Sequence, residues 1–138
     1  MPLRLEIVTA ERVVFSEDVD MVSAPSADGR VGVLARHEPM LALLLPGELH
    51  YVKNGETMPF AVSGGFMEVL PDRVTILADT AERADEIDEA RAEAARRRAE
   101  ERLRQRESDL DFARAELELR RALVRLQVAK LRKERSQR

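Results

Sequence analysis

The sequence has no cysteine, no tryptophan and only two histidines among its 138 residues. Without cysteine the chain forms neither disulfides nor thiolate metal sites, a composition typical of an intracellular protein. An all-histidine metal site would need both His37 and His50 together with carboxylates from elsewhere. A metalloenzyme is therefore not expected.

Long apolar runs are also missing from the sequence. Residues 1–8 alternate apolar and polar side chains, whereas a signal peptide has an unbroken apolar segment. No stretch approaches the roughly 20 apolar residues that a membrane-spanning helix needs. Association with a membrane is therefore expected to go through a partner.

Glycine and proline are absent from the chain after residue 71. All 6 glycines and all 6 prolines lie between Pro2 and Pro71. Residues 1–80 hold 6 basic and 12 acidic side chains, which leaves 17 of the 23 basic and 14 of the 26 acidic side chains for residues 81–138. This break in composition predicts two domains, residues 1–84 and 85–138.

The first half has the pattern of short strands separated by turns. Residues 3–7 and 73–77 alternate apolar and polar side chains, as strands with one solvated face do. Asn54-Gly55 suits a tight type I′ hairpin, and Gly64-Gly65 inside an apolar run indicates a bulge or a close backbone approach. Many short strands at this spacing predict an antiparallel sandwich or barrel.

The second half has the pattern of two helices. Asp85 or Asp88 can cap a first helix that ends near Arg104. Either residue of the Ser108-Asp109 pair can cap a second helix that ends near Arg132. The simplest arrangement of these helices is an antiparallel hairpin.

The two predicted helices share a seam that is rich in alanine. Apolar residues recur every three or four positions, at Ala92, Ala95, Ala99 and Leu103 on the first helix and at Phe112, Ala115, Leu119, Ala122, Leu126 and Ala129 on the second. Alanine buries little area, so at roughly 25 cal/mol per Å² this seam gains less than one built on leucine. A marginally stable hairpin of this kind fits a permanently docked pair, a coiled coil with another subunit, or an element with two docking positions.

Five segments, taken in order, resemble a known family. They are residues 8–15, 29–34, 44–47, 62–69 and 74–81. Their succession, followed by the helical tail, resembles the epsilon subunits of bacterial F-type ATP synthases over essentially the whole chain. The resemblance implies a β plus α fold: a ten-stranded antiparallel β-sandwich at residues 1–84, then an antiparallel two-helix hairpin at residues 85–138.

The resemblance also implies a role in a rotary motor, without catalytic residues of its own. Members of this family are central-stalk subunits of the proton-translocating enzyme, in which the sandwich binds the gamma subunit and rests on the ring of c subunits. The tail can rise into the alpha/beta catalytic hexamer and restrain ATP hydrolysis. By the same resemblance the chain requires no cofactor and lies at the cytoplasmic face of the bacterial cell membrane as a peripheral protein.

One loop departs from the pattern of the family. Where many relatives have Pro-Gly-His followed by a small residue and Pro, this sequence has Ala35-Arg36-His37-Glu38-Pro39. Arg30 also stands at a position that is often acidic. By analogy Arg30, Arg36, His37 and Glu38 face the c ring, so their charge pairing there is expected to differ. A lone histidine such as His37 is more commonly a plain exposed loop residue.

A short motif in the tail resembles the ATP-binding motif of some family members. Residues 87–92, Ile-Asp-Glu-Ala-Arg-Ala, have an aliphatic residue and Asp, two variable positions and then Arg-Ala. The resemblance implies ATP contacts from Glu82, Ile87, Asp88, Arg91 and Ala92, with Ile87, Asp88 and Ala92 near the base or ribose.

The spacing of the arginines supports a nucleotide site independently. If the hairpin turns near Glu107, Arg91 faces the neighbourhood of residue 123, where Arg121 and Arg125 lie on one side of the second helix. Arg98 follows Arg91 by two turns on the same side of the first helix. Facing guanidinium groups repel unless an anion joins them, and phosphate suits their forked donors. ATP is therefore the expected regulatory ligand.

Ordinary salt bridges are the alternative for these arginines. The nearby carboxylates are those of Glu86, Glu89, Glu93, Glu116 and Glu118. The tail has no glycine-rich phosphate loop and no evident magnesium site, so ATP is expected to bind without hydrolysis.

Two other classes of function are disfavoured. A nucleic-acid-binding module would need a broad basic face, but the tail carries 17 basic and 14 acidic side chains that are interleaved. An enzyme of the sandwich type would need a site, but nothing places carboxylates such as Glu48, Glu68 and Asp79 in one pocket, and no nucleophile motif is present.

Overall fold

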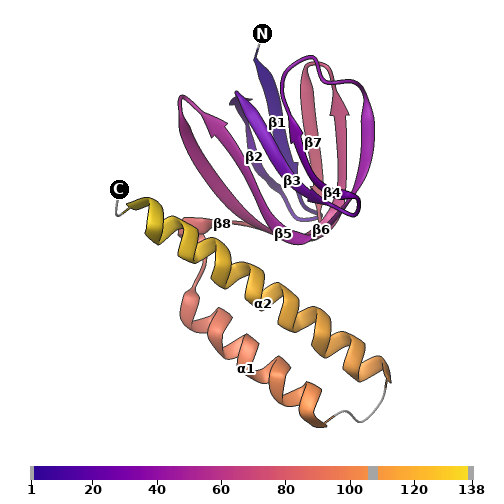
Figure 1. Cartoon of the computed structure of the whole chain (residues 1–138), viewed down its shortest axis with the longest axis vertical. Helices are drawn as coiled ribbons and strands as arrows, with labels where there is room; N and C mark the ends of the chain where they lie inside the picture. Colours follow the sequence, from indigo (N-terminus) through magenta and orange to yellow (C-terminus); the bar gives the residue numbers. More distant parts are fainter. Residues whose placement is uncertain (1, 106–108, 137–138) are drawn as a thin grey trace. The chain divides into compact units, whose positions relative to one another are not determined.

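The chain consists of two compact units, Met1–Arg83 and Ala84–Arg138. The computed structural model describes residues 2–105 and 109–136, and Figure 1 labels their strands and helices. The division follows the break in composition, because the first unit contains all the glycines and prolines and the second is helical.

Eight strands make up the described part of the first unit. They are β1 (Leu3–Val8), β2 (Val13–Val19), β3 (Met21–Ser26), β4 (Gly29–Val33), β5 (Met40–Lys53), β6 (Glu56–Leu70), β7 (Arg73–Ala78) and β8 (Ala81–Arg83). Their order is β2-β1-β7-β6-β5-β3-β4, with β8 paired to β6. The sheet curves over on itself around one core (Figure 1), which confirms the predicted β-sandwich.

Two of these strands are unusually long. β5 has 14 residues and β6 has 15. Pro46-Gly47 lies at the middle of β5, and Gly64-Gly65 lies just past the middle of β6. When the two parts of each long strand are counted separately, the eight strands become the ten that the resemblance implies.

One pair of neighbouring strands is parallel. β1 lies beside β7 with Leu5 opposite Val74 and Ile7 opposite Ile76. Short turns impose antiparallel directions on strands that follow one another, whereas β1 and β7 come from opposite ends of the unit and no turn constrains them. The antiparallel prediction therefore holds for every described pairing except this one.

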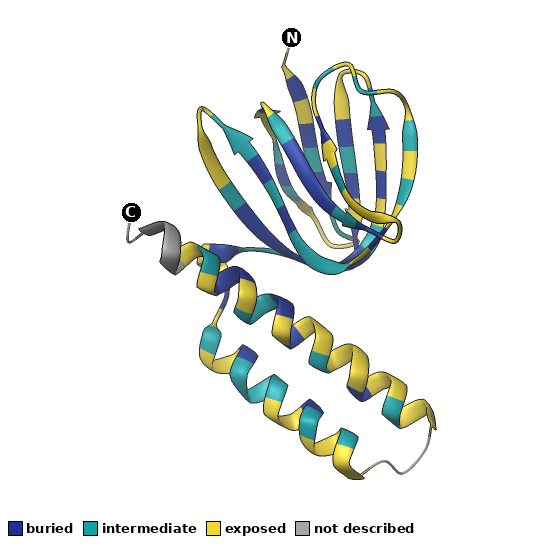
Figure 2. Ribbon diagram, in the orientation of Figure 1, coloured by how far each residue is buried: buried dark blue, intermediate teal, exposed yellow. Residues whose placement is uncertain are grey.

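Apolar side chains that alternate along the strands form the core, and Figure 2 shows them as dark-blue bands. Leu3, Leu5 and Ile7 of β1 are fully buried. Phe15 stacks on Tyr51 with ring centroids 4.6 Å apart. Such aromatic pairs add about 0.5–1.5 kcal/mol beyond the area that they bury.

The turn between β5 and β6 is the predicted tight hairpin. Asn54 and Gly55 have φ angles of 53° and 79°, and Lys53 pairs with Glu56 across the turn. A type I′ turn needs a positive φ at both central residues, which Asn-Gly tolerates best. This prediction is confirmed.

Gly65 is the point of close backbone approach. Its φ is +132°, and a Cβ placed on it would overlap the Leu77 carbonyl oxygen and lie 2.9 Å from the Ala78 Cα. Only glycine combines this φ with so little space. The approach that the Gly64-Gly65 pair predicts is therefore present.

The second unit contains the 3₁₀ helix η1 (Ala84–Glu86) and the helices α1 (Glu89–Gln105) and α2 (Asp109–Ser136). Asp88 caps α1, because its Oδ1 accepts a hydrogen bond of 3.1 Å from the backbone N–H of Arg91. Of the two predicted caps, Asp88 is thus the correct one. Ser108 and the predicted turn near Glu107 lie outside the described residues.

The seam between α1 and α2 is thin, as the alanine pattern predicts. Ala92, Ala99 and Ala115 are fully buried, and Ala122 and Ala129 are nearly so. The leucines of the predicted stripe, Leu103, Leu119 and Leu126, are only half-buried. Small side chains therefore supply the deepest part of the helix contact.

Candidate functional site

A groove on the helical hairpin gathers three of the four arginines that the spacing singles out. It is lined by Ala95, Arg98 and Arg102 of α1 and by Glu118, Arg121, Ala122 and Arg125 of α2. Its volume is about 320 Å³. Four guanidinium groups and one carboxylate therefore line one small groove, which favours an anion.

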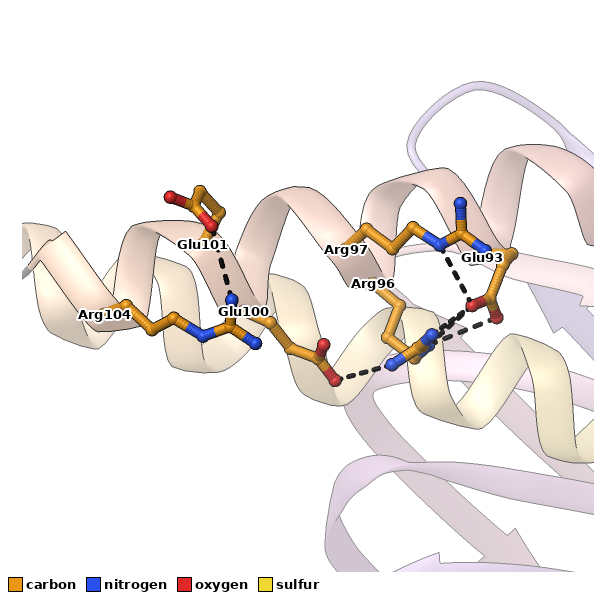
Figure 3. A network of polar contacts seen from close by, with 6 residues as sticks. All are labelled: Glu93, Arg96, Arg97, Glu100, Glu101 and Arg104. Atoms are coloured by element: carbon orange, nitrogen blue, oxygen red, sulfur yellow. Dashed lines mark hydrogen bonds and ion pairs between the residues drawn. The ribbon is translucent and has the colours of Figure 1, made fainter.

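The carboxylates of α1 are engaged with other arginines. Arg96 bonds Glu93 on one side and lies 2.6 Å from Glu100 on the other. Arg104 lies 3.5 Å from Glu101. Figure 3 shows this network along α1. The hydrogen bond from Arg96 lowers the pKa of Glu93, and the two carboxylates raise the pKa of Arg96.

The carboxylates of α2 that the alternative invokes are engaged as well. Glu118 pairs with Arg102 across the hairpin at 2.7 Å, and Glu116 lies 3.9 Å from Arg120. Within the described ranges, neither Arg98 nor Arg121 forms an ion pair or a side-chain hydrogen bond. Salt bridges therefore do not neutralise these two arginines of the groove.

The motif residues lie elsewhere in the hairpin. Arg91 is exposed and does not line the groove, while Ile87 and Ala92 are buried. Asp88 caps α1 through its carboxylate. Glu82 is half-buried in β8, which belongs to the other unit.

The register of the hairpin explains why Arg91 is apart from the groove. Arg102 pairs with Glu118, and the midpoint of that pair is residue 110. The prediction assumed a turn near Glu107 and therefore placed Arg91 too close to Arg121. With the observed register, Arg98 rather than Arg91 faces Arg121 across the groove.

Beside this groove, nearer the interhelical turn, lies a second one of about 410 Å³, lined by Arg102, Gln105, Asp111, Arg114 and Glu118. Its two arginines are matched by two carboxylates. Charge alone therefore gives it no preference for anions.

Arg30, one of the predicted c-ring residues, is engaged within the sandwich. Its Nη1 donates to Ser23 Oγ at 2.7 Å, and its Nη2 donates to the Glu48 carbonyl oxygen at 2.6 Å and to Glu48 Oε2 at 2.9 Å. Glu48 Oε1 is 2.7 Å from His50 Nδ1. This cluster was not predictable from sequence, because it depends on the register of β3, β4 and β5.

The other three predicted loop residues lie between β4 and β5. Arg36 has a φ of 70°, and its backbone N–H donates to the Pro71 carbonyl oxygen at 2.7 Å. His37 Nδ1 lies 2.8 Å from the Glu38 carbonyl oxygen. The loop is thus held against the turn between β6 and β7.

An apolar row crosses the outer face of the sandwich, and the strand patterns alone did not reveal it. Strand pairing aligns Leu43, Phe66, Leu77, Val8 and Val13 on β5, β6, β7, β1 and β2. All but the half-buried Val8 are exposed. The run Leu41–Leu45, in which leucine occupies outward as well as inward positions, is the one sequence signal that could have pointed to part of this row.

Comparison of the sequence with models of known protein families identifies the family of this chain. The model of the beta-sandwich domain of the ATP synthase delta/epsilon chain matches residues 2–84. The model of the long alpha-helix domain of the same chain matches residues 85–130. The chain belongs to the ATP synthase delta/epsilon family. The sequence-based assignment is therefore confirmed.

Similar members of the delta/epsilon family come from bacteria. The chain is 75% identical to the ATP synthase epsilon chain of Herpetosiphon aurantiacus over 135 residues, which are 98% of this chain and 99% of that protein. It is 75% identical to the epsilon chain of Chloroflexus aurantiacus over 96 residues, 70% of this chain and 69% of that protein. It is 56% identical to the epsilon chain of Desulforamulus reducens over 100 residues, 72% of this chain and 76% of that protein.

Solved structures of ATP synthases contain chains with the same fold as this family member. A chain in the OSCP/F1/c-ring structure of Euglena gracilis mitochondrial ATP synthase matches 94% of this chain with a TM-score of 0.80 and 25% identity, over 81% of its own length. A chain in the central stalk/c-ring structure of Tetrahymena thermophila mitochondrial ATP synthase has a TM-score of 0.54 and 16% identity, over 63% of this chain and 70% of its own length. The second likeness concerns the fold alone.

Two kinds of feature are missing from the part of this delta/epsilon chain that the structure describes. No helix there is both long and apolar enough to cross a membrane. No three carboxylate, histidine or cysteine side chains there gather as they would around a metal ion.

Proposed function

We propose that this chain is a non-catalytic subunit of the ATP synthase central stalk that joins the gamma subunit to the c ring and regulates ATP hydrolysis. The family, the bacterial epsilon relatives and the fold likeness to chains in F1/c-ring structures support the role in the stalk. The chain reaches the cytoplasmic face of the membrane through this assembly.

The apolar row is the observation that carries the stalk assignment. Phe66, Leu77 and Leu43 are each at least half exposed although they lie side by side on three strands. A contiguous row of large apolar side chains on a sheet face is typical of an interface with another protein. We assign the gamma subunit to this face, since the family binds gamma through its sandwich.

The loop at residues 35–39 is the proposed contact with the c ring. Arg36, His37 and Glu38 carry its polar groups, and the hydrogen bond to Pro71 fixes its backbone. Arg30 has a different role, because its guanidinium is already bonded to Ser23 and Glu48. The charge pairing with the ring therefore rests on the loop residues.

The groove lined by Arg98, Arg102, Arg121 and Arg125, called the arginine groove from this point, is the proposed regulatory site. ATP binding there joins α1 and α2 and stabilises the folded hairpin, whereas a released tail reaches the alpha/beta hexamer and restrains hydrolysis. The lining supplies no nucleophile and no magnesium ligand set, so ATP binds without turnover. Millimolar ATP should raise the hairpin's melting temperature and its resistance to protease, and the regulatory site is excluded if neither changes.

A pull-down with the gamma-containing complex tests the stalk assignment. Replacing both Phe66 and Leu77 with serine removes two apolar contacts and should weaken binding by about tenfold or more. Leu117→Ser, which changes an exposed leucine of α2, serves as the control and should bind as the unaltered chain does. Retention of the double variant at unaltered affinity would contradict the proposed gamma-binding face.

A further inference from the structure

We infer that two rows of charged side chains beside the apolar row fix the orientation in which the gamma subunit docks on the sandwich. The surface of gamma that meets this face should carry an apolar patch, then basic side chains, then acidic ones. This inference rests on the proposed gamma-binding face and specifies the chemistry of the surface that the face accepts.

The first charged row, called the carboxylate row, lies directly beside the apolar row. Glu68 of β6 pairs with Thr75 of β7, and Thr75 pairs with Glu6 of β1. Side chains two residues apart on a strand point to the same face, so this row shares the outer face with Phe66 and Leu77. The two rows are roughly 7 Å apart, which is the length of two strand residues.

The second charged row, called the arginine row, comes next on the same face. Arg73 of β7 pairs with Arg4 of β1, two residues beyond the carboxylate row. Like charges directly opposite each other on neighbouring strands destabilise a sheet. Arg4 donates to Ser16 Oγ at 3.0 Å and lies 3.4 Å from Asp18, whereas Arg73 is exposed and forms no ion pair within the described part of the chain. The fold therefore keeps an unfavourable pair of arginines on this face.

The arginine row does not neutralise the carboxylate row. Glu68 is exposed and forms neither an ion pair nor a side-chain hydrogen bond with another residue that the structure describes. Glu6 is half-buried, and its Oε1 accepts a hydrogen bond of 3.4 Å from the uncharged Ser16 hydroxyl. Both rows therefore present charge that a partner can pair with.

The spacing of the rows suits side chains of opposite charge on the partner. Neighbouring strands are about 4.8 Å apart, so Glu68 and Glu6, on either side of β7, have Cα atoms roughly 10 Å apart. A lysine or arginine of the partner placed over Thr75 can reach both carboxylates. A carboxylate of the partner placed between Arg73 and Arg4 would remove the repulsion of the arginine row.

The order of the rows gives the face a direction. Apolar contact is non-directional, so the apolar row alone would accept a partner in more than one orientation. A partner turned by 180° in the plane of the sheet would bring its charged groups to the other side of the apolar row, away from both charged rows. Charges at the edge of an interface set orientation and association rate more than affinity. The apolar row therefore supplies binding, and the charged rows select one orientation.

Exchanging the charges of the two rows tests the inference without changing the net charge. Glu68→Arg combined with Arg73→Glu reverses the order of the rows on β6 and β7. Association of this variant with the gamma-containing complex should be about tenfold slower than that of the unaltered chain in about 0.1 M salt. In about 1 M salt, where the Debye length is about 3 Å, the difference should fall below about twofold. Recovery in high salt also shows that the variant is folded and that its apolar row is intact.

Glu17→Arg combined with Lys53→Glu is the matched control. It exchanges the charges of an exposed pair whose Nζ and Oε1 atoms are 3.2 Å apart and which lies outside the three rows. The control should associate within about twofold of the unaltered chain at both salt concentrations.

The outcomes separate the inference from the docking face on which it rests. If the exchanged variant associates normally while the double serine variant of Phe66 and Leu77 loses binding, the inference is overturned and the gamma-binding face stands. Equal slowing in the control, or slowing that persists in 1 M salt, also overturns the inference, because the effect then does not come from the order of the rows. If neither the exchange nor the double serine variant changes binding, both the inference and the face are overturned.

Discussion

Gly65 is the residue at which backbone geometry restricts the sequence most. Gly65→Ala would place a Cβ against the Leu77 carbonyl oxygen at a φ of +132°. We expect this substitution to lower the free energy of unfolding of the sandwich by about 3 kcal/mol, from strain and overlap together. Gly32→Ala is the control, since a Cβ there has no atom within 4 Å, and it should change stability by less than about 0.5 kcal/mol. Equal losses in urea denaturation would contradict the steric account.

Arg30 is the second residue whose role the structure defines. The Glu48 side chain is only 11% exposed and accepts from Arg30, so Arg30→Gln should cost about 1–3 kcal/mol by leaving a largely buried carboxylate with one partner fewer. Arg4→Gln breaks the exposed pair with Asp18 and should cost less than about 1 kcal/mol. Chemical denaturation of both variants measures the difference, and a smaller loss for Arg30→Gln than for Arg4→Gln would contradict this role.

Residues with local roles are predictable from sequence, and residues with distant partners are not. Asp88 as a cap and Asn54-Gly55 as a hairpin depend on neighbours in the chain, so residue type and position suffice. Arg30 reaches Glu48 only through the pairing of β4 with β3 and of β3 with β5. For that reason, sequence alone led us to expect Arg30 to be a surface charge that faces the c ring.

At the scale of elements, ion pairs within α1 stabilise this helix. Arg96 bonds Glu93 and Glu100 within one helix, and the pKa of Glu93 is therefore lowered from its ordinary value of 4.5. A carboxyl whose folded pKa is lowered contributes its stability above the unfolded pKa and loses it as the pH falls through the folded value. Helicity of the tail should thus decline below about pH 4.5. Circular dichroism of Glu93→Gln should show a smaller decline, and an identical acid profile would contradict the assignment.

The alanine seam limits what α1 and α2 tolerate. Ala99 is fully buried, so Ala99→Leu should force the helices apart and destabilise the hairpin by about 1–3 kcal/mol. Ala90→Leu changes an exposed position of α1 and should have an effect below about 0.5 kcal/mol. Limited proteolysis of the tail compares the two, and a hairpin that resists protease equally in both would contradict close packing at Ala99.

The helices were predictable as elements, but their register was not. Alanine and leucine spacing identified both helices and the seam face. Register depends on where the chain turns, and no glycine or proline marks that point in the tail. An error of a few residues there placed Arg91 opposite Arg121 in the prediction, whereas Arg98, which the prediction also named, faces Arg121 in the arginine groove.

At the scale of the whole molecule, composition predicted two units, and their cores follow that division. The β-sandwich was predictable from alternation and turns, whereas the apolar row required the order of five strands, including the parallel pairing of β1 with β7. A row that spans such distant segments has no period in the sequence. The location of the proposed gamma-binding face was therefore the part that sequence reasoning did not find.

The separate cores lead to a prediction for the truncated chain. The core cluster of the sandwich ends at Ala81, so residues 1–83 should fold alone and bind the gamma-containing complex as the full chain does. Without residues 84–138 the proposed brake is gone, and the assembled motor should hydrolyse ATP faster and lose its ATP-dependent regulation. ATPase assays on motors assembled with either chain measure this. If the truncated chain folds and binds but hydrolysis is unchanged, the hairpin has no regulatory role and the stalk function rests on the sandwich alone.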